Sequence, residues 1–249
     1  MAVEMLWTGG WDSTFRLLDL TITQGREVQP HYVRDELRRS TGAELAAMDR
    51  ILDALRAQYP EAAMRVRPVD SSATVASLPP DEVVTASLAR LKEHGHLGDQ
   101  YEWLARFAAE REIDGLELSI HRDDRAAGFL DGHVYVDGDA HVLEDDPSNP
   151  DLAIFGRFRF PLFDITKVQM QGIATAAGWA HLLELTWFCH RPERGKPCGL
   201  CAPCRYTREE GLGRRVPSGR VTSARRQGRR LARRVRRTME RAVRPDTSR

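Results

Sequence analysis

The sequence predicts an α/β fold in which a mostly parallel sheet carries helices on both faces. Short apolar runs of strand length occur at residues 3–7, 28–33, 64–69 and 116–120. Stretches with helical spacing of apolar residues separate them, and strands that alternate with helices are typical of parallel sheets. With 249 residues, the chain is long enough for one well-buried domain.

The helices are expected in the stretches between these runs. We predict helices at 13–20, 43–59, 81–93, 101–110 and 167–177, the last closed by Gly178, and a short helix near Tyr206. Residues 121–160 are acidic and contain glycines, which indicates an irregular insertion at the edge of the sheet. Within it, residues 133–136 and 141–143 have the pattern of a hairpin around Asp137 and Gly138.

The charge of the chain is divided between an acidic body and a basic tail. Residues 214–249 hold fourteen arginines against Glu240 and Asp246, a charge of +12; because the whole chain carries +1, residues 1–213 carry −11. We therefore expect a body of residues 1–213 and an arginine-rich tail, either disordered or an amphipathic helix. Such a tail favours an anionic partner, nucleic acid first, with an anionic membrane or an acidic protein as alternatives.

A glycine turn follows the first predicted strand. Two adjacent glycines before a helix allow backbone N–H groups to approach an anion, but the loop has no lysine and so does not match the P-loop pattern. The alternative is a tight turn with Asp12 as the helix N-cap. The run T-G-G-W-D-S at 8–13 resembles the S-G-G-x-D-S signature of PP-loop ATP pyrophosphatases. The resemblance implies a loop that binds the pyrophosphate of ATP through Thr8, Gly9, Gly10, Trp11, Asp12, Ser13 and Thr14, with Asp12 placed to hold Mg²⁺.

All four cysteines of the chain lie in one short segment. Cys189 is followed by Cys198, Cys201 and Cys204 at C-x2-C-x2-C spacing, within an expected metal-binding segment of residues 186–205. This spacing predicts a closed four-thiolate site for structural Zn²⁺. An iron–sulfur cluster, or a single disulfide between Cys189 and Cys198, remains an alternative.

The segment 160–211 is similar to the C-terminal third of the 7-cyano-7-deazaguanine synthase family. The runs P-L-F-D-I-T-K, T-W-F-C-H and P-C-G-L-C-A-P-C follow one another in the order of that family's motifs. The resemblance implies an adenine nucleotide alpha hydrolase-like fold and zinc held by the four cysteines. It also implies a carbon–nitrogen ligase that uses ATP to adenylate a carboxylate, releases pyrophosphate, and lets ammonia or an amine attack.

The middle of the chain departs from that family. The family's Arg-Asn pair and its D-Y-S-G-Y-P-D-C-R segment are replaced by L-G-D-Q-Y at 97–101 and H-R-D-D-R at 121–125. These departures predict a diverged relative that acts on a different carboxylate, either on a small molecule or at a protein terminus.

The expected catalytic residues are Asp12, Ser13 and Lys167. Lys167 begins a predicted helix, where its charge could reach a phosphate or the activated carboxylate; a solvated helix lysine is the alternative. Asp123 and Asp124 could bind Mg²⁺ or a substrate amine, or could be solvated loop carboxylates. His121 and His190 have no assigned role.

Two other functions are compatible with the sequence. Sulfur transfer to tRNA by a PP-loop enzyme would need a free reactive cysteine. A nucleotide- and nucleic-acid-binding module without catalysis would act through the tail. No apolar run is long enough to span a bilayer and no signal peptide is evident, so we expect a cytoplasmic protein; a homodimer is left open.

Overall fold

The fold was analysed in a computed structural model, which describes residues 2–217. Six strands form one sheet in the order β2-β1-β3-β6-β5-β4. The strands are β1 (Val3–Leu6), β2 (Val28–His31), β3 (Leu116–Glu117), β4 (Val134–Asp137), β5 (Ala140–Leu143) and β6 (Phe158–Phe160). The strands β2, β1, β3 and β6 are parallel, and the β4–β5 hairpin continues the sheet antiparallel to β6. The predicted α/β class is confirmed.

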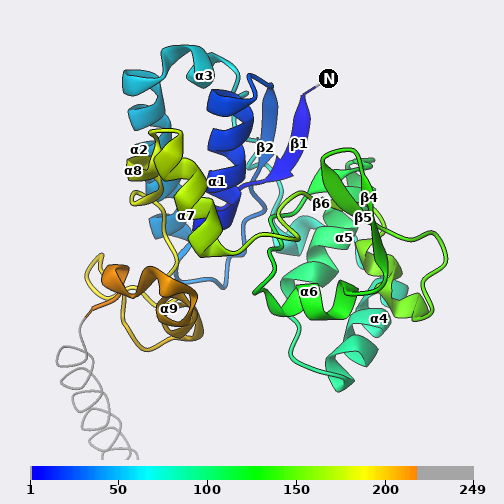
Figure 1. Cartoon of the computed structure of the whole chain (residues 1–249). Coiled ribbons are helices and arrows are strands. Elements are labelled where there is room, and N and C mark those ends of the chain that lie inside the picture. Colours follow the sequence, from blue (N-terminus) through cyan, green and yellow to red (C-terminus); the bar gives the residue numbers. More distant parts are fainter. Residues whose placement is uncertain (1, 218–249) are drawn as a thin grey trace, which may run out of the picture.

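The helices lie on both sides of this sheet (Figure 1). They are α1 (Trp11–Leu18), α2 (Thr41–Gln58), α3 (Pro60–Met64), α4 (Glu82–Glu93), α5 (Gln100–Glu110), α6 (Arg125–Leu130), α7 (Lys167–Ala176), α8 (Ala180–Leu183) and α9 (Ala202–Thr207). Residues 2–217 also contain five shorter helical segments. Two are π-helical, η1 (Asp19–Thr23) and η4 (Arg208–Leu212), and three are 3-10 helices, η2 (Val75–Ser77), η3 (Pro150–Phe155) and η5 (Gly213–Arg215). Within the described residues, no helix is long and apolar enough to cross a membrane.

Alternation along the strands divides the core into two halves. On β1, Val3 and Met5 point into a cluster with α1, α2, α7 and α8, whereas Leu6 packs against the opposite cluster. Leu116 of β3 and Phe158 of β6 also face that opposite cluster, which α4, α5 and η3 cover. Successive side chains of a strand point to opposite faces, so each helix layer receives every second residue.

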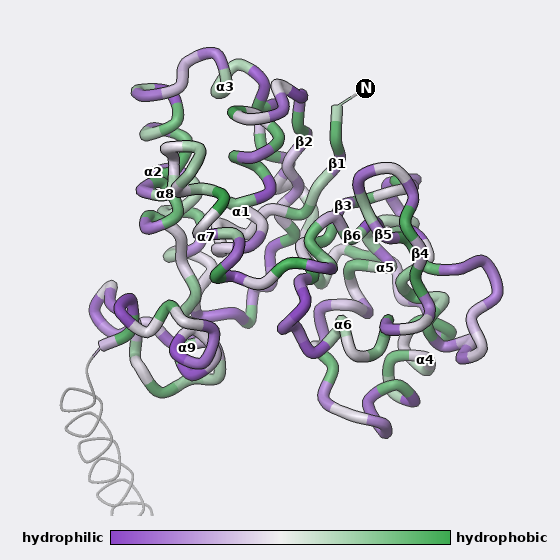
Figure 2. The backbone as a smooth tube through the Cα atoms, viewed as in Figure 1, coloured by the Kyte–Doolittle hydropathy of each residue, from purple (hydrophilic) through white to green (hydrophobic). Residues whose placement is uncertain are grey.

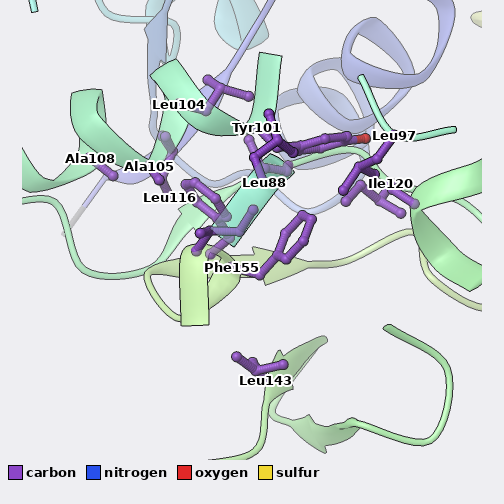
Figure 3. Packing of buried hydrophobic residues seen from close by; sticks show 14 of the residues in the cluster. Leu88, Leu97, Tyr101, Leu104, Ala105, Ala108, Leu116, Ile120, Leu143 and Phe155 are labelled. Atoms are coloured by element: carbon purple, nitrogen blue, oxygen red, sulfur yellow. The ribbon is translucent and has the colours of Figure 1, made fainter. Parts of the chain in front are cut away.

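The second cluster is packed around aromatic rings. The rings of Tyr101 in α5 and Phe155 in η3 lie 5.1 Å apart, and both residues belong to the same cluster as Leu116 of β3 and the helix side chains Leu104 and Leu88 (Figure 3). Figure 2 shows that hydrophobic and hydrophilic residues alternate along the helices. Strands β1 and β3 pair in parallel through Met5 and Glu117, so their carboxyl ends lie next to each other.

A buried ion pair crosses from α1 to the centre of the sheet. The guanidinium of Arg16 donates two 2.7 Å hydrogen bonds to the carboxylate of Glu117 on β3, and a third of 2.9 Å to Asp139 in the hairpin turn. Arg16 and Glu117 are 4% and 2% exposed. This bidentate pair satisfies two charges that could not otherwise be buried.

Two sequence predictions are corrected. The run at 64–69 is not a strand: Met64 ends α3, and the residues after it make only isolated parallel bridges, such as Val28 with Val66. Residues 121–160 are not merely an irregular edge insertion, because they include α6 and β6, and β6 lies between β3 and β5. The hairpin and the helix from Lys167 were predicted to within two residues.

Candidate active site

The loop between β1 and α1 is a tight turn that requires glycine. Gly9 has a φ of +66°, and a Cβ at this position would lie 2.9 Å from Cγ of Met48 and 3.1 Å from the carbonyl oxygen of Glu44. Both the backbone conformation and the close approach of α2 therefore exclude a larger residue. The turn directs the following residues into the amino-terminal turn of α1.

The amino terminus of α1 has no side-chain cap. Gly10 occupies the N-cap position, so the alternative role of Asp12 as the N-cap is wrong. The N–H groups of the first turn are thus left for another partner, and a helix amino terminus favours an anion. The hydroxyls of Thr8 and Ser13 flank this turn: a Cβ on Gly10 would lie 3.3 Å from Thr8 Oγ1 and 4.0 Å from Ser13 Oγ.

Of the seven loop residues predicted to bind nucleotide, five line a cleft: Thr8, Gly10, Trp11, Asp12 and Ser13. The other two face the interior. The side chain of Thr14 is fully buried, and its hydroxyl accepts a 3.0 Å hydrogen bond from the indole of Trp7. The carbonyl of Gly9 accepts a hydrogen bond from the backbone N–H of Trp187. Thr14 and Gly9 therefore support the loop conformation from the side that faces the protein interior.

Lys167 lies at the centre of a charged cluster in this cleft. Its Nζ is 2.7 Å from Glu210 Oε2 and 3.4 Å from Asp12 Oδ2, and its side chain is only 14% exposed. The alternative of a solvated lysine is thus not what the structure shows. Burial by itself lowers the pKa of Lys167, but Asp12 and Glu210 outweigh that effect and hold the pKa above its ordinary value. The ammonium group is therefore charged at neutral pH.

The position of Lys167 is set by its own helix. The Thr166 hydroxyl accepts from the N–H of Gln169, and the side chain of Gln169 accepts in return from the N–H of Thr166, which makes a capping box. Lys167 is the first residue after this cap. The capping box therefore fixes the backbone position of Lys167 beside α1.

His121 is buried against the same cluster. Its Nδ1 accepts a 3.2 Å hydrogen bond from the N–H of Asp123, so in the neutral ring the proton lies on Nε2. Nε2 is 3.9 Å from Asp12 Oδ1 and 4.0 Å from Glu210 Oε1. Two carboxylates, an ammonium and an imidazole thus lie close together beside the loop of residues 8–13, which we call the glycine loop.

Glu210 was not predicted from the sequence. It is brought to Lys167 by the π-helical turn η4, which also contains Gly211 at a φ of +83°. A Cβ on Gly211 would lie 3.0 Å from Cγ2 of Val168, so this turn packs tightly against the start of α7. The only sequence signal was a Glu-Glu-Gly run after the cysteines.

The cleft consists of two adjoining hollows of about 250 Å³ and 840 Å³. The smaller hollow lies over the glycine loop and has an aromatic wall that includes Trp11, Trp103 and Trp187. The larger one extends over Asp123 and the α6 amino terminus, where Asp124 Oδ1 accepts from the N–H of Ala126. Asp12, Lys167, Asp124 and His190 line both hollows, so one bound molecule could reach across from one to the other.

The four cysteines converge on one point. The sulfur atoms of Cys189, Cys198, Cys201 and Cys204 all lie within 4.8 Å of one another, with 3.8 Å between Cys189 and Cys201 and 3.4 Å between Cys201 and Cys204. A tetrahedral site with Zn–S bonds of about 2.3 Å places its sulfurs about 3.8 Å apart. Backbone N–H groups of Leu200 and Cys201 donate hydrogen bonds to the sulfur of Cys198. The donor set therefore fits a zinc ion.

The cysteine segment is joined to the glycine loop through Trp187. Besides the bond to Gly9, the indole N–H of Trp187 donates to the carbonyl of Cys189 at 2.8 Å. In Figure 1, α9 and the end of the described chain lie beside α7 and away from the β4–β5 hairpin. The metal-binding segment thus forms one wall of the cleft.

Arg215 also lines the smaller hollow, although the sequence analysis assigned it to the tail. It lies in η5, directly after the π-helical turn, and its side chain is 7% exposed. The packed body therefore continues past residue 213.

Part of the chain matches a known protein family. Residues 105–215 match the family model described as queuosine biosynthesis protein QueC. No curated protein matches the chain. The matched segment contains the four cysteines, Lys167 and Glu210 and ends at Arg215, whereas the glycine loop lies outside it. Over residues 105–215 the chain is therefore QueC-like.

Proposed function

We propose that this chain is an ATP-dependent enzyme that transfers AMP to a substrate carboxylate and releases pyrophosphate. The observation that carries the proposal is the contact of Lys167 with Asp12 at the amino terminus of α1, beside the glycine loop. This contact joins a phosphate-binding turn to a lysine of the QueC-like segment. It places a fixed cation and a carboxylate where an anionic nucleotide would meet the helix.

The loop geometry favours pyrophosphate as the leaving group. Thr8, Gly10 and Ser13 offer hydroxyls and N–H groups at a helix end, but none of the loop residues is a lysine that would handle a γ-phosphate. A carboxylate oxygen of the substrate would attack the α-phosphorus of ATP. The bond from that phosphorus to the β-phosphate bridging oxygen would break, and pyrophosphate would leave with that oxygen.

The chain's own residues supply the charge for this step. Asp12 would hold Mg²⁺ together with phosphate oxygens, and its Oδ1 has no hydrogen-bond partner among the described residues. Lys167 would donate hydrogen bonds to the phosphate oxygens on which charge develops. Glu210 and His121 keep Lys167 and Asp12 in place. When bound, Mg²⁺ would neutralise part of the negative charge of the phosphates.

The second half-reaction is attack by ammonia or an amine on the acyl carbon. The nitrogen forms the new bond, AMP leaves with the carboxyl oxygen that it had received, and the nitrogen loses a proton. In this proposal the larger hollow, which is lined by Asp123, Asp124 and Lys167, would hold the carboxylate substrate and the amine. Because residues 97–101 and 121–126 form much of this hollow, departures from the family at these positions support a different substrate.

Zn²⁺ has a structural role in this proposal. With Cys189, Cys198, Cys201 and Cys204 all bound, no coordination position stays open for a substrate. The same four residues are all the cysteines of the chain, so none is left to carry a persulfide, and this disfavours the tRNA thiolation alternative.

The test is product analysis with the full-length protein. ATP, Mg²⁺ and ammonia are supplied with a panel of carboxylates, including deazapurine carboxylates and peptide termini, and nucleotide products are separated by chromatography. AMP and pyrophosphate formed only with a particular carboxylate support the proposal. ADP and phosphate as the main products contradict it.

A further inference from the structure

We infer that Arg215, at the start of the arginine-rich region, binds the pyrophosphate portion of ATP. This inference rests on the proposed function and adds a residue that the glycine-loop pattern does not contain. The loop has no cation of its own, although a pyrophosphate group needs one. Arg215 lines the same hollow as Gly10, Trp11 and Ser13.

The side chain of Arg215 is held between two aromatic rings. Its guanidinium carbon lies 5.1 Å from the ring centre of Trp11 and 5.3 Å from that of Phe188. Trp11 is the first residue of α1, so these contacts hold the guanidinium against a side chain of the first turn of that helix. Stacked arginines keep their remaining donors in a fixed plane, which suits phosphate oxygens.

The hydrogen bonds of Arg215 leave part of its donor capacity for a ligand. One terminal nitrogen donates to the carbonyl of Thr186 at 2.6 Å and approaches that of Glu184 at 3.4 Å. Its Nε is 3.4 Å from the carboxylate of Glu184, which also pairs with Arg214. A guanidinium has five N–H donors, so these contacts do not exhaust it.

The other cations of the smaller hollow pair with carboxylates that are more buried, whereas the carboxylate of Glu184 near Arg215 is 44% exposed and is shared with Arg214. Lys167 lies between Asp12 and Glu210, and Arg38 is 3.6 Å from Glu44. Burial lowers the pKa of Arg215 to about 10, so the group still carries its charge at neutral pH. Arg215 is thus a charged group of this hollow that could pair with a phosphate in addition to Lys167.

The test compares three full-length proteins: wild type, R215Q and R214Q. Glutamine keeps a side-chain N–H donor but removes the charge. R214Q is the matched control, because Arg214 is 45% exposed and does not line the hollow. Binding of ATP, pyrophosphate and adenosine is measured by calorimetry. The basic tail is present in all three proteins, so its own affinity for anions cancels from the comparison.

We expect R215Q to lose about 10- to 100-fold in affinity for ATP and pyrophosphate, as for the loss of a charged hydrogen bond, with adenosine affinity unchanged. R214Q should bind like wild type. Equal ATP and pyrophosphate affinities in folded R215Q and wild type would overturn the assignment of Arg215 alone. Absence of ATP binding by wild type would instead overturn the proposed function.

A second measurement does not depend on the stability of the variant. In the wild-type protein, the Nε–Hε resonance of Arg215 in a ¹⁵N-selective spectrum should shift when pyrophosphate is added, while that of Arg214 should not. Assignment can use R215K, which removes the guanidinium and keeps the charge. A resonance of Arg215 that does not respond to saturating pyrophosphate would also overturn the inference.

Discussion

The backbone N–H of Trp187 donates a 2.8 Å hydrogen bond to the carbonyl of Gly9. This bond joins the cysteine segment to the glycine loop, two regions separated by most of the chain. Trp187 is also tied to Cys189 through its indole. The glycine loop is therefore in direct contact with the segment that holds the four cysteines.

From this contact we predict that metal loss disturbs nucleotide binding as well as the cysteine segment. The purified protein should contain about one zinc per chain, by elemental analysis, because the four thiolates form a closed site. Replacing Cys201 and Cys204 together with serine should remove the zinc and weaken ATP binding. Iron with acid-labile sulfide, or zinc retained by the double variant, would contradict this prediction.

The second prediction concerns Asp12. Since Asp12 does not cap α1, Asp12→Ala should leave the fold intact and lower the turnover of ATP by about 100- to 1,000-fold, as for loss of a group that stabilises transition-state charge. The matched control is Asp53→Ala on α2, whose side chain is 75% exposed. Circular dichroism and pyrophosphate release check both variants. A folded Asp12→Ala protein with a near-normal rate would show that Asp12 is not catalytic.

The third prediction separates the charge of Lys167 from its packing. In Lys167→Met, Asp12 and Glu210 lose their shared cation, and the free energy of unfolding should fall by ~1–2 kcal/mol, a value reduced because Asp12 is a quarter exposed. Mg²⁺ should restore part of this loss, since a cation can replace the ammonium between the carboxylates. Thermal unfolding with and without Mg²⁺ measures the effect. The same stability in both conditions would argue against a cation site here.

The sequence predicted the parts of the site that are local in the chain. Gly9 and Gly10 are marked by the turn they make, and C-x2-C-x2-C spacing brings thiolates together whatever the rest of the fold does. Lys167 could be named because its segment resembles a family motif. In each case the residues that make up the motif lie within about ten positions of one another in the sequence.

The contacts that were missed depend on tertiary packing. Glu210 meets Lys167 only because a π-helical turn bends the chain back, and no residue pattern marks such a turn reliably. Thr14 and Ser13 are neighbours with similar side chains, yet the rotation of α1 turns one to Trp7 and the other to the cleft. The strand β6 has three residues, too few for alternation to show, and its place in the sheet is set by β3.

The fourth prediction concerns the buried pair at the centre of the sheet. Glu117→Leu would leave Arg16 as a buried charge with Asp139, which is 46% exposed, and Asp19, which is 4.0 Å away, as its remaining partners. Breaking one side of a buried pair costs ~3–5 kcal/mol, so the urea midpoint of unfolding should fall strongly. Asp114→Asn is the control, because Asp114 is 84% exposed and its pair with Arg157 lies at the surface. Equal midpoints for the two variants would show that the Arg16–Glu117 pair does not stabilise the fold.

The last prediction concerns the arginine-rich tail, most of which lies outside the described residues. The predicted boundary after residue 213 would remove Arg215 from the cleft and Val216, which is 7% exposed, from its contacts with the cysteine segment. A truncation after Pro217 avoids both losses. It still removes twelve arginines and only two carboxylates.

We propose that this tail binds an anionic macromolecule, with nucleic acid as the first candidate. Arginines gain affinity for nucleic acid mainly by releasing counterions from phosphates, so binding should weaken steeply as salt rises. Full-length protein should therefore bind tRNA or duplex DNA at low salt and lose this binding at higher salt. The protein truncated after Pro217 should bind weakly at both salt concentrations, yet retain the turnover of ATP. Anionic vesicles in the same titration distinguish a membrane surface from nucleic acid. If the full-length protein binds none of these polyanions at low salt, the proposed interaction is wrong.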